Sequence, residues 1–137
     1  MVVEISKSAF EAMKSHAERG YPAEVCGVMA GGGARVEESM ECENLNTERA
    51  HDRYELDPAS FNEADSSARE KGLGIVGIYH SHPDHPARPS ETDRQRAWSG
   101  WGYLIMSVEE GVFKEATLWY LNEQTGQFEK ADFSVFS

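Results

Sequence analysis

The chain has 137 residues, which is enough for one domain with its own hydrophobic core and too few for two ordinary domains. Its 24 acidic residues against 13 basic ones give a net charge of -11, which disfavours a nucleic acid or an anionic membrane as a partner. No run of eighteen uncharged apolar residues predicts a membrane span, and two cysteines are too few for a disulfide framework, so we expect a cytoplasmic protein.

The first part of the chain predicts a strand, a helix and a hairpin. Residues 2–5 read as a short strand, and Ser6 or Ser8 can cap a helix that Gly20 ends. A second strand is expected over residues 24–30, with residues 31–33 as a glycine turn and a partly polar return strand over 34–43. The glycine triplet is not followed by the Lys-Ser/Thr of a phosphate-binding loop, so it predicts a turn.

The second part alternates helices and strands. Residues 54–56 predict a short strand, and Asp57-Pro58 begins a helix that should continue to about Lys71. The continuous apolar run over residues 73–79 predicts a strand buried on both faces, which leads directly into His80. A third helix is expected over residues 90–99, and strands over 103–108 and 116–121. This order predicts one α/β domain over residues 1–137, with a curved mixed sheet flanked by helices.

The segment that carries chemistry runs from His80 to Asp93. His80 and His82 alternate at the end of an extended run, so both imidazoles should leave the same face of the strand, about 6.5 to 7 Å apart at their Cα atoms. Zinc is bound by imidazole nitrogens and carboxylate oxygens, and a catalytic zinc site needs three protein ligands. Three prolines between residues 83 and 89 stiffen the connection and can return Asp93 toward the histidines. Ser90 and Asp93 also fit a helix-capping pattern, and the two roles are compatible.

These residues resemble a known family. His-Ser-His, then seven residues, Ser90, two residues and Asp93 match the JAMM (MPN+) metallopeptidase signature position by position. Upstream, Glu24 precedes Cys26-Gly27, as the acid/base glutamate of that family does, and the order of elements before it is similar. The resemblance covers nearly the whole chain. It implies a JAMM/MPN-like, cytidine-deaminase-like fold.

The resemblance also implies a role for each matching position. His80, His82 and Asp93 correspond to the zinc ligands, with a water completing the site, and Glu24 corresponds to the general acid/base. Ser90 corresponds to the serine that hydrogen-bonds the oxyanion. The chain looks like the minimal bacterial form, whose members hydrolyse amide bonds at the C-terminal Gly-Gly of ubiquitin-like sulfur-carrier proteins. Two alternatives stay open: a zinc peptidase on small or cell-wall peptides, and a metal-free MPN scaffold.

Other candidate residues have simpler interpretations. Lone histidines such as His16 and His51 usually lie on the surface or have a partner in the core, and Cys26 in an apolar strand is expected to be buried. His85 and Arg88 lie in the loop beside the proposed metal, where they could steer a substrate carboxylate, although loop residues are more commonly solvated. Core or edge packing is the expectation for the three tryptophans, Trp98, Trp101 and Trp119.

Overall fold

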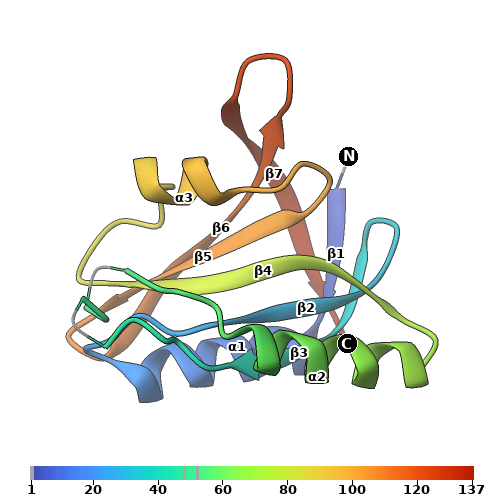
Figure 1. Ribbon diagram of the computed structural model, residues 1–137, viewed down its shortest axis with the longest axis horizontal. Coiled ribbons are helices and arrows are strands. Elements are labelled where there is room, and N and C mark those ends of the chain that lie inside the picture. Colours follow the sequence, from blue (N-terminus) through green and yellow to red (C-terminus); the bar gives the residue numbers. More distant parts are fainter. Residues whose placement is uncertain (1, 48, 52) are drawn as a thin grey trace.

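The computed structural model describes residues 2–47, 49–51 and 53–137. The described residues form a curved sheet and three helices (Figure 1), in the order β1 (Val2–Ser6), α1 (Lys7–Gly20), β2 (Cys26–Gly32), β3 (Arg35–Cys42), α2 (Pro58–Glu70), β4 (Gly74–Pro83), α3 (Glu91–Arg96), β5 (Gly102–Glu109), β6 (Val112–Asn122) and β7 (Gln127–Phe136). None of these helices is both long enough and apolar enough to cross a lipid bilayer.

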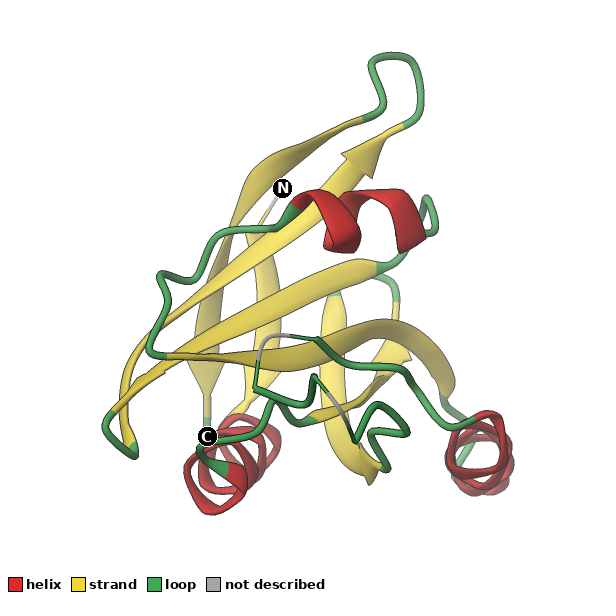
Figure 2. Ribbon diagram, turned by 60° about the vertical axis from the view of Figure 1, so that its left-hand side comes forward, coloured by secondary structure: helices red, strands yellow, loops and turns green. Residues whose placement is uncertain are grey.

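The sheet is mixed and closes on itself. Its strand order is β1-β3-β2-β4-β5-β6-β7, and β7 pairs with β1 to complete a barrel. β4 and β5 are parallel, whereas β2 is antiparallel to both of its neighbours. Figure 2 shows the strands curving across the molecule, with the helices outside the row of strands. The expected α/β fold with a curved mixed sheet is confirmed.

Two helices cover the sheet through small or apolar side chains at helical spacing. Ser6 caps α1 by accepting a hydrogen bond from the Ala9 amide at 3.1 Å, as expected from the sequence. One core cluster joins the buried face of α1, including Met13, to strands on one side of the sheet. A second cluster joins α2, including Ala64, to residues of β2, β3, β4 and β5 on the other side. The site described below lies on this second side.

The central strand β4 includes the predicted apolar run and continues through Pro83. It contains both motif histidines, as their alternation at the end of an extended run predicted. The reason is its pairing, because His80 to Pro83 lie opposite Ile105 to Val108 of β5 in a parallel ladder. The two histidines are therefore held by main-chain hydrogen bonds of a central strand rather than by a loop.

Several other boundaries differ from the predicted ones. The glycine turn is shifted, because Gly31 and Gly32 belong to β2, and a Cβ on Gly31 would lie 1.9 Å from the Arg35 carbonyl oxygen. Residues 54–56 contribute only one isolated bridge, between Asn44 and Leu56, rather than a strand. The strand β7 was not predicted, since its exposed positions leave few buried apolar residues to mark it.

The third helix is shorter than expected, and this changes the position of one tryptophan. α3 ends at Arg96, and Ala97 is already extended. Trp98 consequently projects from the chain with 70 % of its surface exposed, which corrects the expectation that it packs in the core or at an edge. Cys26 is fully buried, as expected.

Candidate metal centre

His80 and His82 lie on the same face of β4, because alternate side chains of a strand share a face. Their ring centroids are 5.1 Å apart, and their side chains are only 0 % and 10 % exposed. Nδ1 of His82 lies 2.9 Å from the Pro86 carbonyl oxygen, which can only accept a hydrogen bond. Nδ1 therefore carries a proton, which leaves Nε2, 3.2 Å from Asp93 Oδ2, as the ring nitrogen that can bind a metal when it is deprotonated.

Asp93 approaches the two histidines from the start of α3. The Ser90 amide donates to Asp93 Oδ2 at 2.8 Å, and the Asp93 amide donates to Ser90 Oγ at 3.1 Å, which together form a capping box. The box orients the carboxylate so that Oδ1 lies 3.7 Å from His80 Nε2 and Oδ2 lies 3.2 Å from His82 Nε2. Helix capping and the contact with both imidazoles are thus made by the same residue.

Glu24 reaches the site from the segment just before β2. Its Oε1 lies 3.5 Å from His80 Nδ1, and the side chain is 4 % exposed. Ser81, between the two histidines, accepts a hydrogen bond from the Val25 amide at 2.9 Å, while the Ser81 amide donates to the Val25 carbonyl at 3.1 Å. These two bonds fix the main chain beside Glu24 against β4.

Asn44 supports the same segment from the other side. Its Nδ2 donates to the carbonyl oxygens of Glu24 at 3.0 Å and of Arg53 at 3.1 Å. Its Oδ1 accepts from the Glu55 amide at 2.9 Å. One side chain therefore holds Glu24 next to the segment that carries Tyr54, whose ring stacks on His80 with centroids 4.6 Å apart.

The protonation of Asp93 and His82 is coupled. Burial works to raise the pKa of Asp93, but the adjacent His80 and His82 rings and the Ser90 amide outweigh it and hold that pKa well below its ordinary range. Burial works to lower the pKa of His82, but the hydrogen bonds to Asp93 and Pro86 outweigh it and raise that pKa. The Asp93 carboxylate is therefore ionised near neutral pH and ready to neutralise positive charge at the His82 ring.

Three buried atoms at the centre of this cluster have no hydrogen-bond partner within the described residues. They are Oε1 of Glu24 and both ring nitrogens of His80. Leaving a buried polar atom unpaired costs about 1–3 kcal/mol, so a group of them indicates a place for a ligand. One ligand atom each from Glu24, His80 and His82 lies within 4.8 Å of the others. Two imidazoles with two carboxylates suit zinc and similar divalent ions, so these residues fit a metal.

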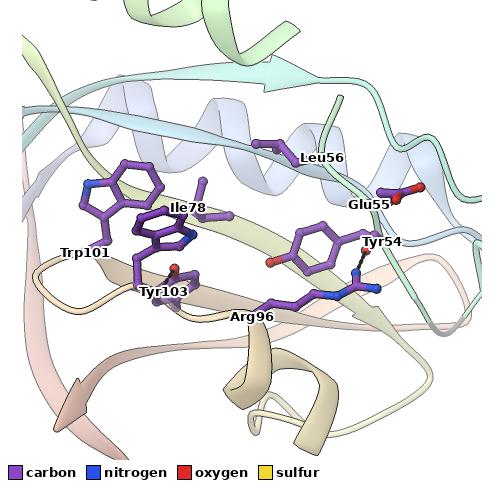
Figure 3. A pocket seen from close by; sticks show the side chains of 8 residues that line it. Tyr54, Glu55, Leu56, Ile78, Arg96, Trp101 and Tyr103 are labelled. Carbon is purple, nitrogen blue, oxygen red and sulfur yellow. Dashed lines mark hydrogen bonds between the residues drawn. The ribbon is translucent and has the colours of Figure 1, made fainter. Parts of the chain in front are cut away.

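Two cavities open beside the cluster. The first, of about 380 Å³, reaches the cluster itself and is lined by Glu24, His82, His85, Pro86, Arg88 and Ser90. The second, of about 280 Å³, lies beyond the Tyr54 ring and is lined by Tyr54, Glu55, Leu56, Ile78, Arg96, Trp98, Trp101 and Tyr103. Figure 3 shows that its aromatic rings come from segments far apart in the sequence, and that the Arg96 guanidinium reaches the Tyr54 carbonyl. The Tyr54 ring thus joins His80 to an aromatic pocket, whereas Glu24 and His82 themselves line the other cavity.

The structure places every residue that the motif predicted around one point. Glu24 lies next to His80, Asp93 lies next to both histidines, and Ser90 lines the cavity that reaches Glu24. The predicted site residues did not include Ser81, Asn44 and Tyr54, which position these groups. Ser81 stood inside the motif, where its place between two candidate ligands was a signal. Asn44 and Tyr54 carried none, because their contacts are made only in the folded chain.

The comparison with protein families agrees with this arrangement. Residues 6–122 match the model for prokaryotic homologs of the JAB domain. The chain belongs to this family. The JAB-domain match includes Glu24, both histidines and Asp93, and it confirms the JAMM/MPN resemblance that the motif indicated.

Curated relatives of this JAB-family chain include peptidases. A protein of Haloferax volcanii named desampylase is 38 % identical over 77 % of this chain and 80 % of its own length. A probable TtuB-protein conjugate cleaving protease of Thermus thermophilus is 29 % identical over 80 % of this chain and 72 % of its own length. The tail tip assembly protein K of Escherichia phage N15 is 38 % identical over 64 % of this chain but only 33 % of its own length. The prediction of a JAMM-type metallopeptidase is confirmed at this level.

A solved structure supports the fold. The solution structure of a protein from Desulfitobacterium hafniense matches 99 % of this chain and 94 % of its own, with a TM-score of 0.85 and 26 % identity. A JAB1/MPN domain protein of Archaeoglobus fulgidus matches 99 % of this chain and 98 % of its own, with a TM-score of 0.64 and 16 % identity. The prediction of a JAMM/MPN-like fold is therefore confirmed as well.

Proposed function

We propose that this chain is a zinc-dependent isopeptidase or peptidase that hydrolyses the amide bond after the C-terminal Gly-Gly of a ubiquitin-like sulfur-carrier protein. The observation that carries the proposal is the buried cluster of His80, His82 and two carboxylates, with three atoms that lack partners among the described residues. The relatives add support, because proteins similar to this chain act on ubiquitin-like proteins. The cellular setting that we propose is the cytoplasm.

His80, His82 and Asp93 would hold the metal. The Nε2 atoms of both histidines lie next to the Asp93 carboxylate, at 3.7 and 3.2 Å, whereas Glu24 lies at the other nitrogen of His80. When bound, zinc acts as a Lewis acid on the scissile carbonyl and makes water a nucleophile near neutral pH. The remaining steps are proton transfers and hydrogen bonds that the chain itself supplies.

Glu24 is the proposed general acid/base. Its Oε1 accepts no hydrogen bond from any described residue, so it is free to take a proton from the attacking water. Its side chain lines the cavity beside His82, so the same proton can be returned to the leaving nitrogen there. Burial among protein groups keeps bulk water from competing for that proton.

Ser90 is the proposed donor to the carbonyl oxygen of the substrate. Its Oγ accepts from the Asp93 amide, so the hydroxyl hydrogen is left to point elsewhere. Ser90 lines the same cavity as Glu24. A hydroxyl held by a helix cap is a preorganised donor, which is the kind of group that stabilises developing negative charge on an oxygen.

The depth of the cluster favours a slender substrate. The ligand side chains are at most 10 % exposed, so the scissile bond must pass between the cavity walls to reach them. Two glycines without side chains can do so in extended form, which residues with bulkier side chains cannot. The aromatic pocket beyond Tyr54 then offers apolar surface to the carrier residues that precede the two glycines.

The test uses a ubiquitin-fold protein that ends in Gly-Gly and is extended by one alanine. The zinc-loaded protein should release the alanine, as measured by mass spectrometry, and a substrate with Ala-Ala in place of Gly-Gly should resist. Glu24→Gln should retain zinc and lose roughly 10²- to 10⁴-fold in kcat, the usual size of a general acid/base contribution. Near-normal turnover in this variant would show that the base is a different residue.

The same experiment separates the alternatives. Similarity to a phage tail tip protein favours, as a second candidate, a peptidase for small or cell-wall peptides. Hydrolysis of short peptides without any preference for the carrier would select that candidate. A protein that takes up no zinc and cleaves neither substrate would instead be a non-catalytic scaffold.

A further inference from the structure

The cavity beside Glu24 contains a cation that the proposed mechanism does not use. Arg88 lines this cavity together with Glu24, His82 and Ser90. In the proposed mechanism Glu24 returns the proton to the leaving nitrogen, so that nitrogen lies in the cavity that Glu24 lines. Arg88 lines the same cavity and can therefore contact the leaving group.

The loop that carries Arg88 is fixed to the sheet. Ser107 Oγ donates to the His85 carbonyl at 2.6 Å, and Thr117 Oγ1 donates to the Ala87 carbonyl. Ala87 is buried, and the Arg88 amide donates to the Pro86 carbonyl at 2.8 Å. Hydrogen bonds to β5 and β6 hold the residues just before Arg88, and Pro89 follows directly after it. These restraints fix the backbone position from which the Arg88 side chain extends. The backbone at such a position is preorganised, so ligand binding has to order only the Arg88 side chain.

Arg88 has no anionic partner within the described residues. Ion pairs there involve the arginines at positions 19, 35, 69 and 94, and the guanidinium groups of Arg53 and Arg96 donate to Thr92 Oγ1 and to the Tyr54 carbonyl. In a chain with a net charge of -11, several arginines have carboxylates nearby, whereas Arg88 beside this cavity is left without one among the described residues. Guanidinium groups bind carboxylates through two parallel hydrogen bonds, so a ligand carboxylate is the partner that this position fits.

We propose that Arg88 binds the α-carboxylate of a single amino acid leaving group, and that the enzyme prefers such conjugates to lysine isopeptides. This inference rests on the proposed function and specifies its substrate class. In an amino acid joined through its α-nitrogen, one carbon separates the scissile nitrogen from the carboxylate, so both enter the cavity together. In an isopeptide the nitrogen ends a four-carbon lysine stem and brings no carboxylate with it.

The test compares three substrates made on one ubiquitin-fold protein that ends in Gly-Gly. The first carries alanine with a free carboxylate, the second carries alanine amide, and the third carries Nα-acetyl-lysine amide joined through Nε. For the wild-type protein, kcat/KM should be roughly 10- to 100-fold higher for the free acid than for either other substrate, as expected for a hydrogen-bonded charge pair. In Arg88→Gln this ratio should fall to near one, while cleavage of alanine amide is unchanged.

Two further variants control the result. Arg69→Gln removes the same charge from the exposed end of α2, far along the chain from the site, and should keep the wild-type ratio. Arg88→Lys retains the charge without the two-pronged geometry and should give an intermediate ratio. Zinc content and melting temperature of each variant should equal those of the wild type, because Arg88 is exposed and makes no ion pair with a described residue.

The outcomes separate this inference from the function on which it rests. Equal wild-type cleavage of acid, amide and isopeptide, or an unchanged ratio in Arg88→Gln, would overturn the role of Arg88 and leave the hydrolase intact. Failure of the wild type to cleave any of the three would overturn the proposed function, and the inference with it.

Discussion

Tyr79 and His80 are neighbours in β4, each is 1 % exposed, and they point to opposite faces of the sheet. On one face, the Tyr79 hydroxyl lies 2.7 Å from Nδ1 of His16, in the core cluster beneath α1. On the other face, neither ring nitrogen of His80 has a hydrogen-bond partner in the described part of the chain. Tyr79 and His80 are thus equally buried, but the Tyr79 hydroxyl has a hydrogen-bond partner whereas the ring nitrogens of His80 have none among the described residues.

The comparison shows how a buried polar group signals function. A folded chain normally pairs its buried donors and acceptors, as it does for Tyr79, because leaving one unpaired is costly. The side of β4 that carries His80 keeps unpaired atoms next to two carboxylates, and that arrangement is stable when a cation completes it. Three variants test whether the two faces differ in this way.

The largest effect is expected for His80→Leu, which removes the two unpaired ring nitrogens from this face of β4. Metal affinity should fall more than 100-fold, because loss of a ligand exceeds the 10- to 100-fold effect of losing an outer partner. The metal-free variant should be more stable than the metal-free wild type by about 1 kcal/mol or more, since two unpaired buried nitrogens are removed. Isothermal titration with zinc and urea denaturation with and without chelator measure the two quantities. A metal-free variant that is less stable would mean that His80 contributes packing or bonds that the structure does not show.

A smaller effect is expected for Tyr79→Phe, which removes the hydrogen bond between Tyr79 and His16 on the opposite face of β4. Loss of the hydroxyl leaves His16 Nδ1 without its partner, so the free energy of unfolding should fall by about 1–2 kcal/mol. Zinc affinity should stay within about twofold of the wild-type value, because Tyr79 faces away from the cluster. A large loss of zinc affinity in this variant would show that the two faces are not independent.

The smallest effect concerns the pH dependence of stability. Burial lowers the pKa of His16 below 6.5, despite the opposing effect of Glu41. The protonated form is therefore disfavoured in the folded state, so the stability that His16 contributes is present above pH 6.5 and is lost as pH falls through the lowered value. His16→Asn should remove this component, and the difference from the wild type in urea titrations at pH 5 to 8 isolates it. A difference that does not change with pH would contradict the assignment.

The raised pKa of His82 gives the metal-free protein a contribution of opposite sign. Its stability is present at low pH and is lost as pH rises through the raised value, so it persists in both proteins of the His16 comparison and cancels. The pKa values of the two histidines therefore shift in opposite directions, because burial dominates at His16 whereas the hydrogen bonds to Asp93 and Pro86 outweigh burial at His82.

The sequence alone predicted the residues of the candidate site, which the structure brings together, and the elements that carry most of them. Alternation put His80 and His82 on one face, and Ser90 with Asp93 predicted the capping box that the structure contains. The caps of α1 and α2 could also be predicted from the sequence. The side chains of Ser6 and Asp57 accept hydrogen bonds from the first amides of each helix, and Pro58 fits the first position of α2. These features depend on a few neighbouring residues, which is why a linear pattern reveals them.

Only the tertiary structure decided how those residues are used. The partner that holds β4 through the motif is β5, and the position of Glu24 depends on Ser81 and Asn44, which are distant from it in the chain. The exposure of Trp98 depends on where α3 ends. The placement of Arg88 in the cavity of Glu24 depends on the path of the loop between β4 and α3. Contacts of this kind join separate segments, and no local pattern encodes them, because they exist only once the sheet has closed.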